Sequence, residues 1–205
     1  MPRKPNIASK KQPRQSRSIA TVAAIVEAAT YILSRGGLAD FTSNKVAERA
    51  GVNVASFYQY FPNKEALLFH IVQRTWDEQL ARLEPILTSG DASPADRLRA
   101  FVRELMLVEA AEAELRRGMR AASVELHDTP EFKALLARGT ALFNGFLTDA
   151  LGARVPDALD FTVETIAILI TSFTERATDE RRARDHLLRQ ADFLAELLIA
   201  RFDLS

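Results

Sequence analysis

Apolar residues recur every three or four positions through most of the 205-residue chain, which is the spacing of one face of an α-helix. Glycine, proline and polar turn residues interrupt these runs. The pattern predicts long helices over about residues 18–34, 64–83, 94–112, 113–127, 130–151, 160–178 and 180–202, and two short helices over 42–50 and 54–61. We therefore expect an all-α fold.

The two short helices are joined by Gly51-Val52, a tight turn that glycine permits. Phe57 and Phe61 lie four apart and should share the inward face of the second helix. This leaves an outward face of small residues, then hydroxyl, amide and phenol groups. Helix, glycine turn and helix follow in the helix-turn-helix order, and such a face can enter a DNA major groove. The alternative is an ordinary pair of helices in an all-α core.

Charge is distributed unevenly along the chain, although the net charge is zero. Residues 1–64 hold ten basic and three acidic residues, and residues 65–205 hold 17 basic and 24 acidic residues. A basic end on an acidic body suits contact with a polyanion. We expect residues 1–16 to be a disordered basic arm that follows phosphates, with Arg14 and Arg17 as its contacts. A solubilising or inert tail is the alternative.

Several classes of site are missing from the sequence. There is no cysteine, the three histidines are far apart, and no Gly-rich phosphate loop or recognisable Ser-His-acid triad occurs. We therefore expect no catalytic residues, no metal and no cofactor. A small-molecule enzyme would need a cluster of polar residues of that kind. No apolar run of membrane-spanning length and no signal peptide is evident, which predicts a cytoplasmic protein.

The stretch from about Ile19 to Ile71 resembles the N-terminal domain of the TetR repressor family. The resemblance rests on the segments IVEAA, GG, FT, VA, AGV, FY and, above all, YQYFPNKEALL, which ends at Leu68. Gln59 stands where relatives often carry His or Trp, so the operator sequence does not transfer. The resemblance implies a three-helix helix-turn-helix DNA-binding domain over 17–63 and a helical effector-binding and dimerisation domain over 64–205.

Roles in DNA binding follow from side-chain chemistry, and each position matches one that touches DNA in TetR-like proteins. The amides of Gln59 and Asn44 suit adenine edges, and Val54 and Ala55 suit thymine methyl groups. Hydroxyl groups and an ammonium suit phosphate oxygens. These phosphate candidates are Ser43, Ser56, Tyr58, Tyr60 and Lys64, and Thr42, which caps its helix, is included among the DNA contacts.

The helix over 160–178 has an unusually apolar centre, and the last helix has a broad apolar stripe. Together they favour half of a four-helix dimer interface. The candidate interface residues are Ile166, Ile170, Leu187, Ala191, Leu194 and Leu198. The resemblance points the same way, because the last two long helices are the usual dimer contact in TetR-like proteins. The alternative is that these helices complete the core of a single chain.

The resemblance also implies a small-molecule effector that binds among the helices after residue 64. Candidate pocket residues are Trp76, Phe101, Met106, Met119, Phe143, Phe146 and Phe173, each of which is otherwise a core residue. Their apolar character suits a hydrophobic ligand. The resulting hypothesis is a homodimeric repressor of a pseudo-palindromic DNA operator. An activator of the same family, or a helix-turn-helix module for protein contact alone, remains open.

Overall fold

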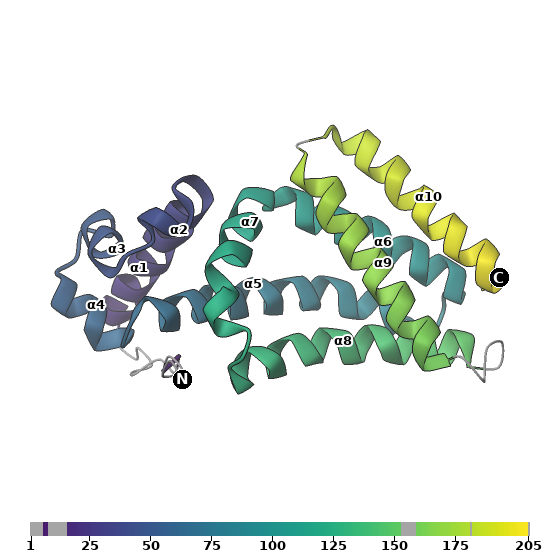
Figure 1. Ribbon diagram of the computed structural model, residues 1–205, viewed down its shortest axis with the longest axis horizontal. Helices are drawn as coiled ribbons and strands as arrows, with labels where there is room; N and C mark the ends of the chain where they lie inside the picture. The colour runs from purple at the N-terminus through teal and green to yellow at the C-terminus, as the bar shows by residue number, and fades with distance from the viewer. Residues whose placement is uncertain (1–5, 8–15, 153–158, 181, 205) are drawn as a thin grey trace. The chain divides into compact units, whose positions relative to one another are not determined.

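The computed structural model describes residues 6–7, 16–152, 159–180 and 182–204, which form helices and contain no strand (Figure 1). The all-α prediction is confirmed. In chain order the helices are α1 Ser16–Arg35, α2 Gly37–Asp40, α3 Ser43–Arg49, α4 Val54–Tyr60, α5 Lys64–Leu87, α6 Pro94–Ala111, α7 Ala113–Ala122, the 3-10 turn η1 Ser123–Leu126, α8 Pro130–Leu151, α9 Leu159–Asp179 and α10 Arg184–Phe202.

Three helix boundaries differ from the sequence-based expectation. The Gly36-Gly37 break is followed by the short helix α2, which the pattern did not predict. Helix α5 continues past Pro85 to Leu87. A proline lacks the backbone N–H and so removes one helical hydrogen bond. Only two residues of α5 follow Pro85, so little of the helix depends on that bond. The segment expected as one helix over 113–127 is α7 followed by a 3-10 turn.

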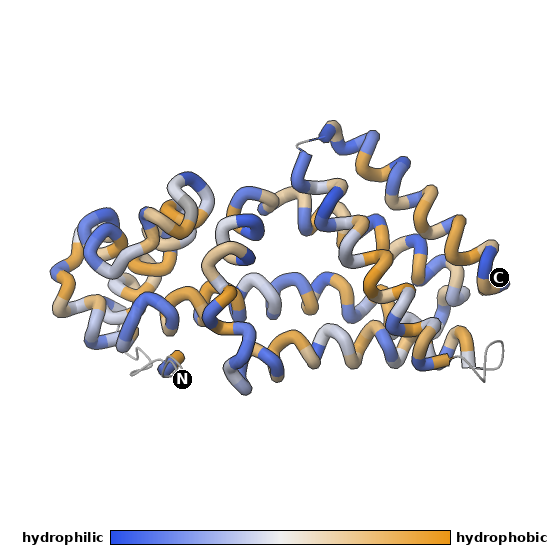
Figure 2. The backbone as a smooth tube through the Cα atoms, viewed as in Figure 1, coloured by the Kyte–Doolittle hydropathy of each residue, from blue (hydrophilic) through white to orange (hydrophobic). Residues whose placement is uncertain are grey.

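The chain divides into two compact units. Unit 1 comprises Met1–Trp76 and Glu114–Ala134, and unit 2 comprises Asp77–Ala113 and Leu135–Ser205. The predicted boundaries after residues 16 and 63 stay predictions. Orange apolar and blue polar residues alternate around most helices in both units (Figure 2). Each unit therefore has to bury the apolar side of its own helices.

Unit 1 is built on α1, which contacts α2 and α3. Six α1 residues are buried, and the aromatic rings of Phe41, Phe57 and Phe61 are almost fully buried in the same unit. Ile19 is exposed, because the buried stripe of α1 begins one to two turns later at Ile25. Among the described helices, α1 alone is long and apolar enough to cross a membrane by length and composition, contrary to the expectation that no apolar run reaches that length. Of this apolar stretch, 33% is buried within the protein.

Helix α7 approaches the end of α1 at Gly118, which is buried. A Cβ atom at this position would overlap the backbone carbonyl oxygen of Leu33. That oxygen belongs to the last turn of α1, so it cannot move without disturbing the helix end. The close approach of the two helices therefore requires a residue without a side chain at position 118.

Replacement of Gly118 by alanine is expected to destabilise the protein by about 1–3 kcal/mol, because the added methyl group forces α7 and α1 apart. Thermal unfolding measures the change. Gly145→Ala is the control, since position 145 in α8 is exposed and faces open space. Alanine there should stabilise the helix by up to about 1 kcal/mol. Equal effects of the two substitutions would contradict the close approach.

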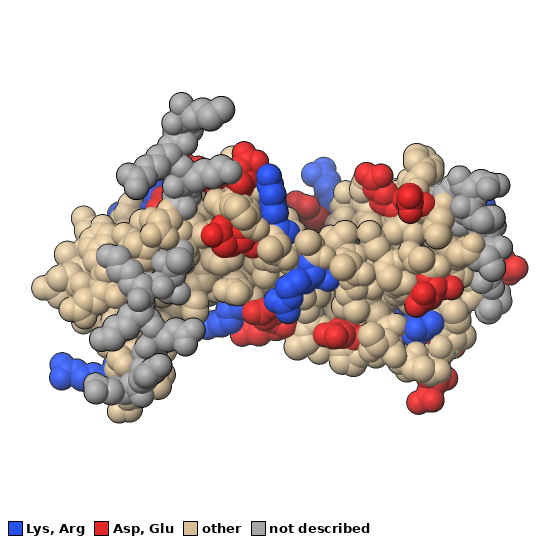
Figure 3. Space-filling model, turned by 90° about the horizontal axis from the view of Figure 1, so that it is seen from below, with Lys and Arg blue, Asp and Glu red and all other residues tan. Residues whose placement is uncertain are grey.

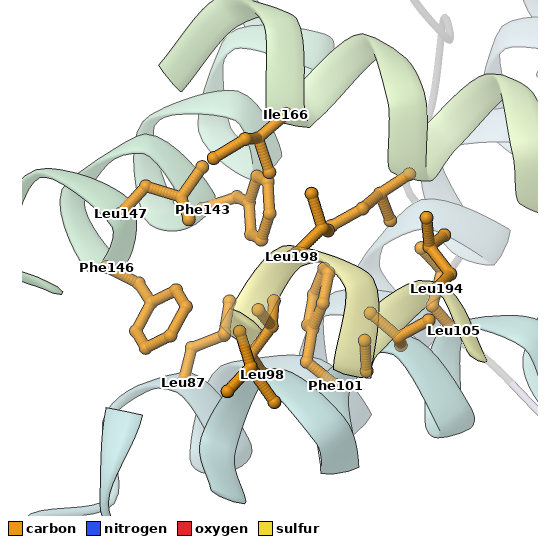
Figure 4. Packing of buried hydrophobic residues seen from close by; sticks show 14 of the residues in the cluster. Leu87, Leu98, Phe101, Leu105, Phe143, Phe146, Leu147, Ile166, Leu194 and Leu198 are labelled. Atoms are coloured by element: carbon orange, nitrogen blue, oxygen red, sulfur yellow. The ribbon is translucent and has the colours of Figure 1, made fainter. Parts of the chain in front are cut away.

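Unit 2 has a core contributed by α6, α8, α9, α10 and the end of α5. Figure 4 shows their side chains pointing toward one another, among them Phe101, Phe143 and Leu198. The rings of Phe101 and Phe143 are stacked with centroids 4.8 Å apart. Helices α6 and α10 are also joined by the ion pairs Arg99–Glu196 and Arg103–Asp192. These pairs are exposed enough that each contributes little, about 0–1 kcal/mol.

Candidate nucleic-acid interface

Helix α3 starts at a capped turn. Thr42 has an extended backbone, and its hydroxyl oxygen accepts a hydrogen bond from the Lys45 backbone N–H at 3.3 Å. Phe41 before the cap and Val46 after it are both buried, as expected for a hydrophobic staple. The cap leaves Thr42 and Asn44 exposed at the start of the helix and Ser43 half-buried.

The turn between α3 and α4 depends on Gly51, whose φ of +66° is in the left-handed region. Its N–H donates to the carbonyl of Glu48, and the next N–H, that of Val52, donates to Ala47. These bonds satisfy carbonyl groups at the end of α3. Asn53 then begins α4, because its side-chain oxygen accepts a 2.8 Å hydrogen bond from the Ala55 N–H. The glycine turn and the Thr42 cap agree with the sequence-based expectation.

Helix α4 has two contrasting faces. Phe57 is fully buried, and its ring lies 5.9 Å from that of Phe61. The outward residues are exposed or half-buried. Val54, Ala55, Tyr58 and Gln59 are exposed, and Ser56 and Tyr60 are half-buried. The two phenylalanines therefore hold a short helix from behind and leave its polar and small side chains open to a partner.

The residues after α4 lead directly into α5. Asn63 caps α5, because its Oδ1 accepts a 2.7 Å hydrogen bond from the Ala66 N–H. The half-buried Lys64 has its Nζ 3.9 Å from the Glu65 carboxylate, a distance that leaves the ammonium able to contact another anion. On the inner side, burial lowers the pKa of His70, and the charge of Arg74 lowers it further. His70 packs against Phe61 and is therefore favoured in its neutral form.

Two further cations near α3 contact side chains of their own unit. Lys45 pairs with Asp40, and the Arg49 guanidinium lies 3.2 Å from the centre of the Tyr31 ring. Residues of α1 and α3, including these two cations, line an open groove of about 980 Å³. Among the described residues, groups of three or more acidic or histidine side chains that would hold a metal ion are absent.

The structure brings most of the DNA-contact candidates together on α3, α4 and the start of α5. Arg17, in the first turn of α1, is exposed. Arg14 lies outside the described residues. The disordered arm predicted for residues 1–16 also lies mostly outside them. At Asn6 and Ile7 the structure departs from that expectation, because Ile7 is buried.

The ligand-pocket candidates do not form one set. Phe101, Met106, Phe143 and Phe146 belong to the core of unit 2, and Phe173 packs at its edge. Trp76 and Met119 belong to unit 1. Met119 is buried, and Trp76 is half-buried with its indole N–H enclosed and without a hydrogen-bond acceptor among the described residues. For Phe101, Met106, Phe143 and Phe146, membership of the core supports the alternative that they are ordinary core residues.

The dimer candidates need correction. Ile166, Ile170 and Leu194 are buried in the core of unit 2, and so are the other candidates Leu187, Ala191 and Leu198. Ile166, Leu194 and Leu198 can be followed in Figure 4. Since they already pack within their own chain, they are not available to a second copy. The exposed apolar residues of α9 and α10 are instead Phe161, Ile168, Leu169, Phe193 and Leu197.

The sequence carried a signal for these missed residues. Phe193 and Leu197 are four apart on α10, and Phe161 and Ile168 are seven apart on α9, so each pair repeats at helical spacing. Both helices thus have two apolar stripes, and pattern alone does not say which stripe is inside. On the face drawn in Figure 3, acidic and basic side chains lie in small groups, several of them side by side, among uncharged surface.

Comparisons with known proteins agree with this architecture. Residues 25–71 match the family described as bacterial regulatory proteins, tetR family. An uncharacterized HTH-type transcriptional regulator of Mycobacterium tuberculosis is 29% identical over 151 residues, which is 74% of this chain and 68% of the relative. The HTH-type transcriptional repressor KstR of Mycolicibacterium smegmatis is 35% identical over 81 residues, 40% of this chain and 39% of that protein.

A solved structure shares the fold. The transcriptional regulator FadR from Bacillus subtilis, in complex with stearoyl-CoA, superimposes with a TM-score of 0.64 at 18% identity and covers 87% of this chain and 97% of its own. The segment that matches the tetR family, residues 25–71, runs from the buried half of α1 through α3 and α4 into α5. It contains the capped helices, the Gly51 turn and the outward face of α4. The chain is a member of the TetR family of transcriptional regulators.

Proposed function

We propose that this regulator is a repressor that binds a pseudo-palindromic DNA operator as a homodimer and leaves it when a small hydrophobic ligand binds. The observation that carries the proposal is α4, held from behind by Phe57 and Phe61 with its small and polar side chains open. A helix of this kind fits the major groove. As a bacterial DNA-bound regulator, the protein would act in the cytoplasm.

Base reading is assigned to α4 and phosphate contact to its surroundings. Gln59 would bond an adenine edge, and Val54 and Ala55 would touch thymine methyl groups. The remaining candidates would hold phosphates and fix the register of the helix. These are Arg17, Thr42, Ser43, Asn44, Ser56, Tyr58, Tyr60 and Lys64, with Arg14 from the basic arm; Asn44 also suits an adenine edge.

We assign the contact with a second copy of the chain to the exposed apolar residues of α9 and α10. Phe161, Phe193 and Leu197 are large side chains exposed to water in the single chain, and two copies of these helices would bury them in a four-helix interface. A two-fold dimer would place two α4 helices on successive major grooves, on the order of 34–36 Å apart. The two-fold axis is what makes the operator pseudo-palindromic.

The ligand is assigned to unit 2, whose core contains four of the seven pocket candidates, Phe101, Met106, Phe143 and Phe146. The FadR neighbour was solved with stearoyl-CoA, and the repressor KstR is a relative, so a hydrophobic effector and a repressing role both have precedent in similar proteins. A ligand releases DNA only by binding the released conformation more tightly than the DNA-bound one. Effector and operator affinities should therefore weaken each other by the same factor.

Selection of duplexes from a random pool by the purified protein tests the proposal. Recovery of a two-fold symmetric motif supports specific recognition by a dimer. Duplex binding that depends on salt but yields no motif would overturn the base-reading assignments. A protein that binds no duplex before or after refolding would favour a module for protein contact. An operator placed upstream of a promoter that it stimulates would indicate an activator.

Replacement of Lys64 by alanine should weaken binding to every duplex alike, because a phosphate contact carries no sequence information. The slope of log affinity against log salt should fall by about 0.9, the contribution of one phosphate. Titration of duplexes at several salt concentrations measures both. Gln59→Ala is the matched contrast, since it should relax preference at one position per half-site by about 1–3 kcal/mol. An unchanged slope in Lys64→Ala would remove this residue from the interface.

A further inference from the structure

The N-terminal segment contains one apolar side chain that does not behave as part of a solvated arm. Ile7 is only 4% exposed, although it stands in a stretch rich in lysine, arginine and proline. The residue before it is held as well, because the Asn6 carbonyl oxygen accepts a hydrogen bond of 3.0 Å from the side chain of Asn63. Asn6 is 57 positions from Asn63, so this hydrogen bond is a tertiary contact.

Asn63 uses both ends of its amide. Its Oδ1 accepts the Ala66 N–H and caps α5, and its Nδ2 donates to the Asn6 carbonyl. The same side chain thus joins the start of α5 to the N-terminal segment. It stands in the turn between Tyr60 and Lys64, two residues that we assign to phosphate contact. A contact that orders this turn therefore acts on the proposed interface.

We propose that Asn6 and Ile7 form an N-terminal anchor that braces the turn between α4 and α5, and that Asn63 is its positioning residue. The effect of the anchor on DNA affinity rests on the proposed DNA binding, whereas the contact itself is a property of the free protein. Burial of an isoleucine and a tertiary hydrogen bond oppose the entropy of ordering two terminal residues. A turn already ordered in the free protein loses less freedom on binding, so the anchor raises affinity without contacting DNA.

Four variants distinguish the effect of losing the anchor from the effect of losing the α5 cap and from the general effect of making an apolar side chain polar. Asn63→Ser keeps a good neutral N-cap for α5 but removes the amide that reaches Asn6. Ile7→Ser removes the buried side chain, and Ile7→Leu keeps an apolar one of the same size. Val124→Ser is the control for an apolar-to-serine change in unit 1, since Val124 is 68% exposed in η1 and outside the proposed interface.

The first measurement needs no DNA. In the ¹⁵N–¹H spectrum of the free protein, the side-chain amide signal of Asn63 is assigned by its loss in Asn63→Ser. Ile7→Ser should shift this signal and speed its exchange with solvent, whereas Ile7→Leu and Val124→Ser should leave it in place. An unchanged Asn63 signal in Ile7→Ser would overturn the anchor, whether or not the protein binds DNA.

The second measurement uses the duplex recovered by selection. Asn63→Ser and Ile7→Ser should each weaken binding by about three- to tenfold, the range expected when one modest interaction is lost. The salt slope should not change, because no phosphate contact is removed. The double variant should be no weaker than the worse single variant, since both break one contact. Wild-type affinity, tighter binding or additive losses would overturn the positioning role.

Discussion

Replacement of Phe57 by alanine is expected to unfold the DNA-binding helices. Phe57 is fully buried in unit 1, in contact with the rings of Tyr58 and Phe61. Removing a buried phenylalanine ring costs about 3–5 kcal/mol, from lost burial and the cavity left behind. A domain is stable by only about 5–15 kcal/mol in total. Thermal unfolding followed by circular dichroism should show a transition lowered by many degrees, with loss of operator binding.

Tyr58→Ala is the matched control for this result. Tyr58 is the next residue in α4, but its side chain points outward and is exposed. Its removal should lower the stability much less, by about 0.5–1.5 kcal/mol, because only the edge contact with the Phe57 ring is lost. Operator affinity should nevertheless fall, because a proposed phosphate contact is lost. Equal loss of stability in both variants would contradict the two-faced arrangement of α4.

Replacement of Phe193 by glutamate is expected to convert the proposed dimer to monomers. Phe193 is 69% exposed in the single chain and is assigned to the interface. In a two-fold interface the substitution appears twice, so two carboxylates would be buried without partners. A cost of several kcal/mol would raise the dimer dissociation constant at least about 1,000-fold. Sedimentation velocity over a range of protein concentrations measures the change.

Stability and DNA binding distinguish loss of the interface from misfolding. The Phe193→Glu monomer should unfold at the same temperature as the wild-type monomer, since Phe193 contributes little to the core. Binding to a full operator should weaken greatly, because the two α4 helices are linked in a dimer but bind independently in separate chains. Leu136→Glu on α8 is the control, an apolar-to-acidic change at an exposed position outside α9 and α10. A Phe193→Glu protein that remains dimeric would place the interface elsewhere.

The helix-turn-helix region was predictable almost residue by residue. Thr42 acts as a cap as expected, and Gly51 has the left-handed backbone that the turn suggested. Asn53 and Asn63 cap the next two helices by the same local chemistry. Phe57 and Phe61 are inside and Tyr58 and Gln59 outside. These features depend on interactions between residues within four positions of one another, which a single sequence displays directly.

The inward faces of the later helices were not predictable in the same way. The interface assigned to Ile166, Leu194 and Leu198 was placed on residues that the structure buries in unit 2. Helices α9 and α10 have apolar residues on more than one side, so periodicity marks them as buried without naming the partner. The anchor formed by Asn6 and Ile7 escaped prediction because its partner is 57 residues away.

Sequence alone therefore determined the all-α class, the caps and the turn of the helix-turn-helix, and the contrast between the two faces of α4. Those properties come from local backbone preferences and from 3.6-residue periodicity. Tertiary structure decided which apolar stripe of α9 and α10 enters the core, why α7 needs Gly118 beside Leu33, and that Ile7 is buried. Each of these depends on the close packing of segments distant in sequence, and burial is settled only when both packed surfaces are present.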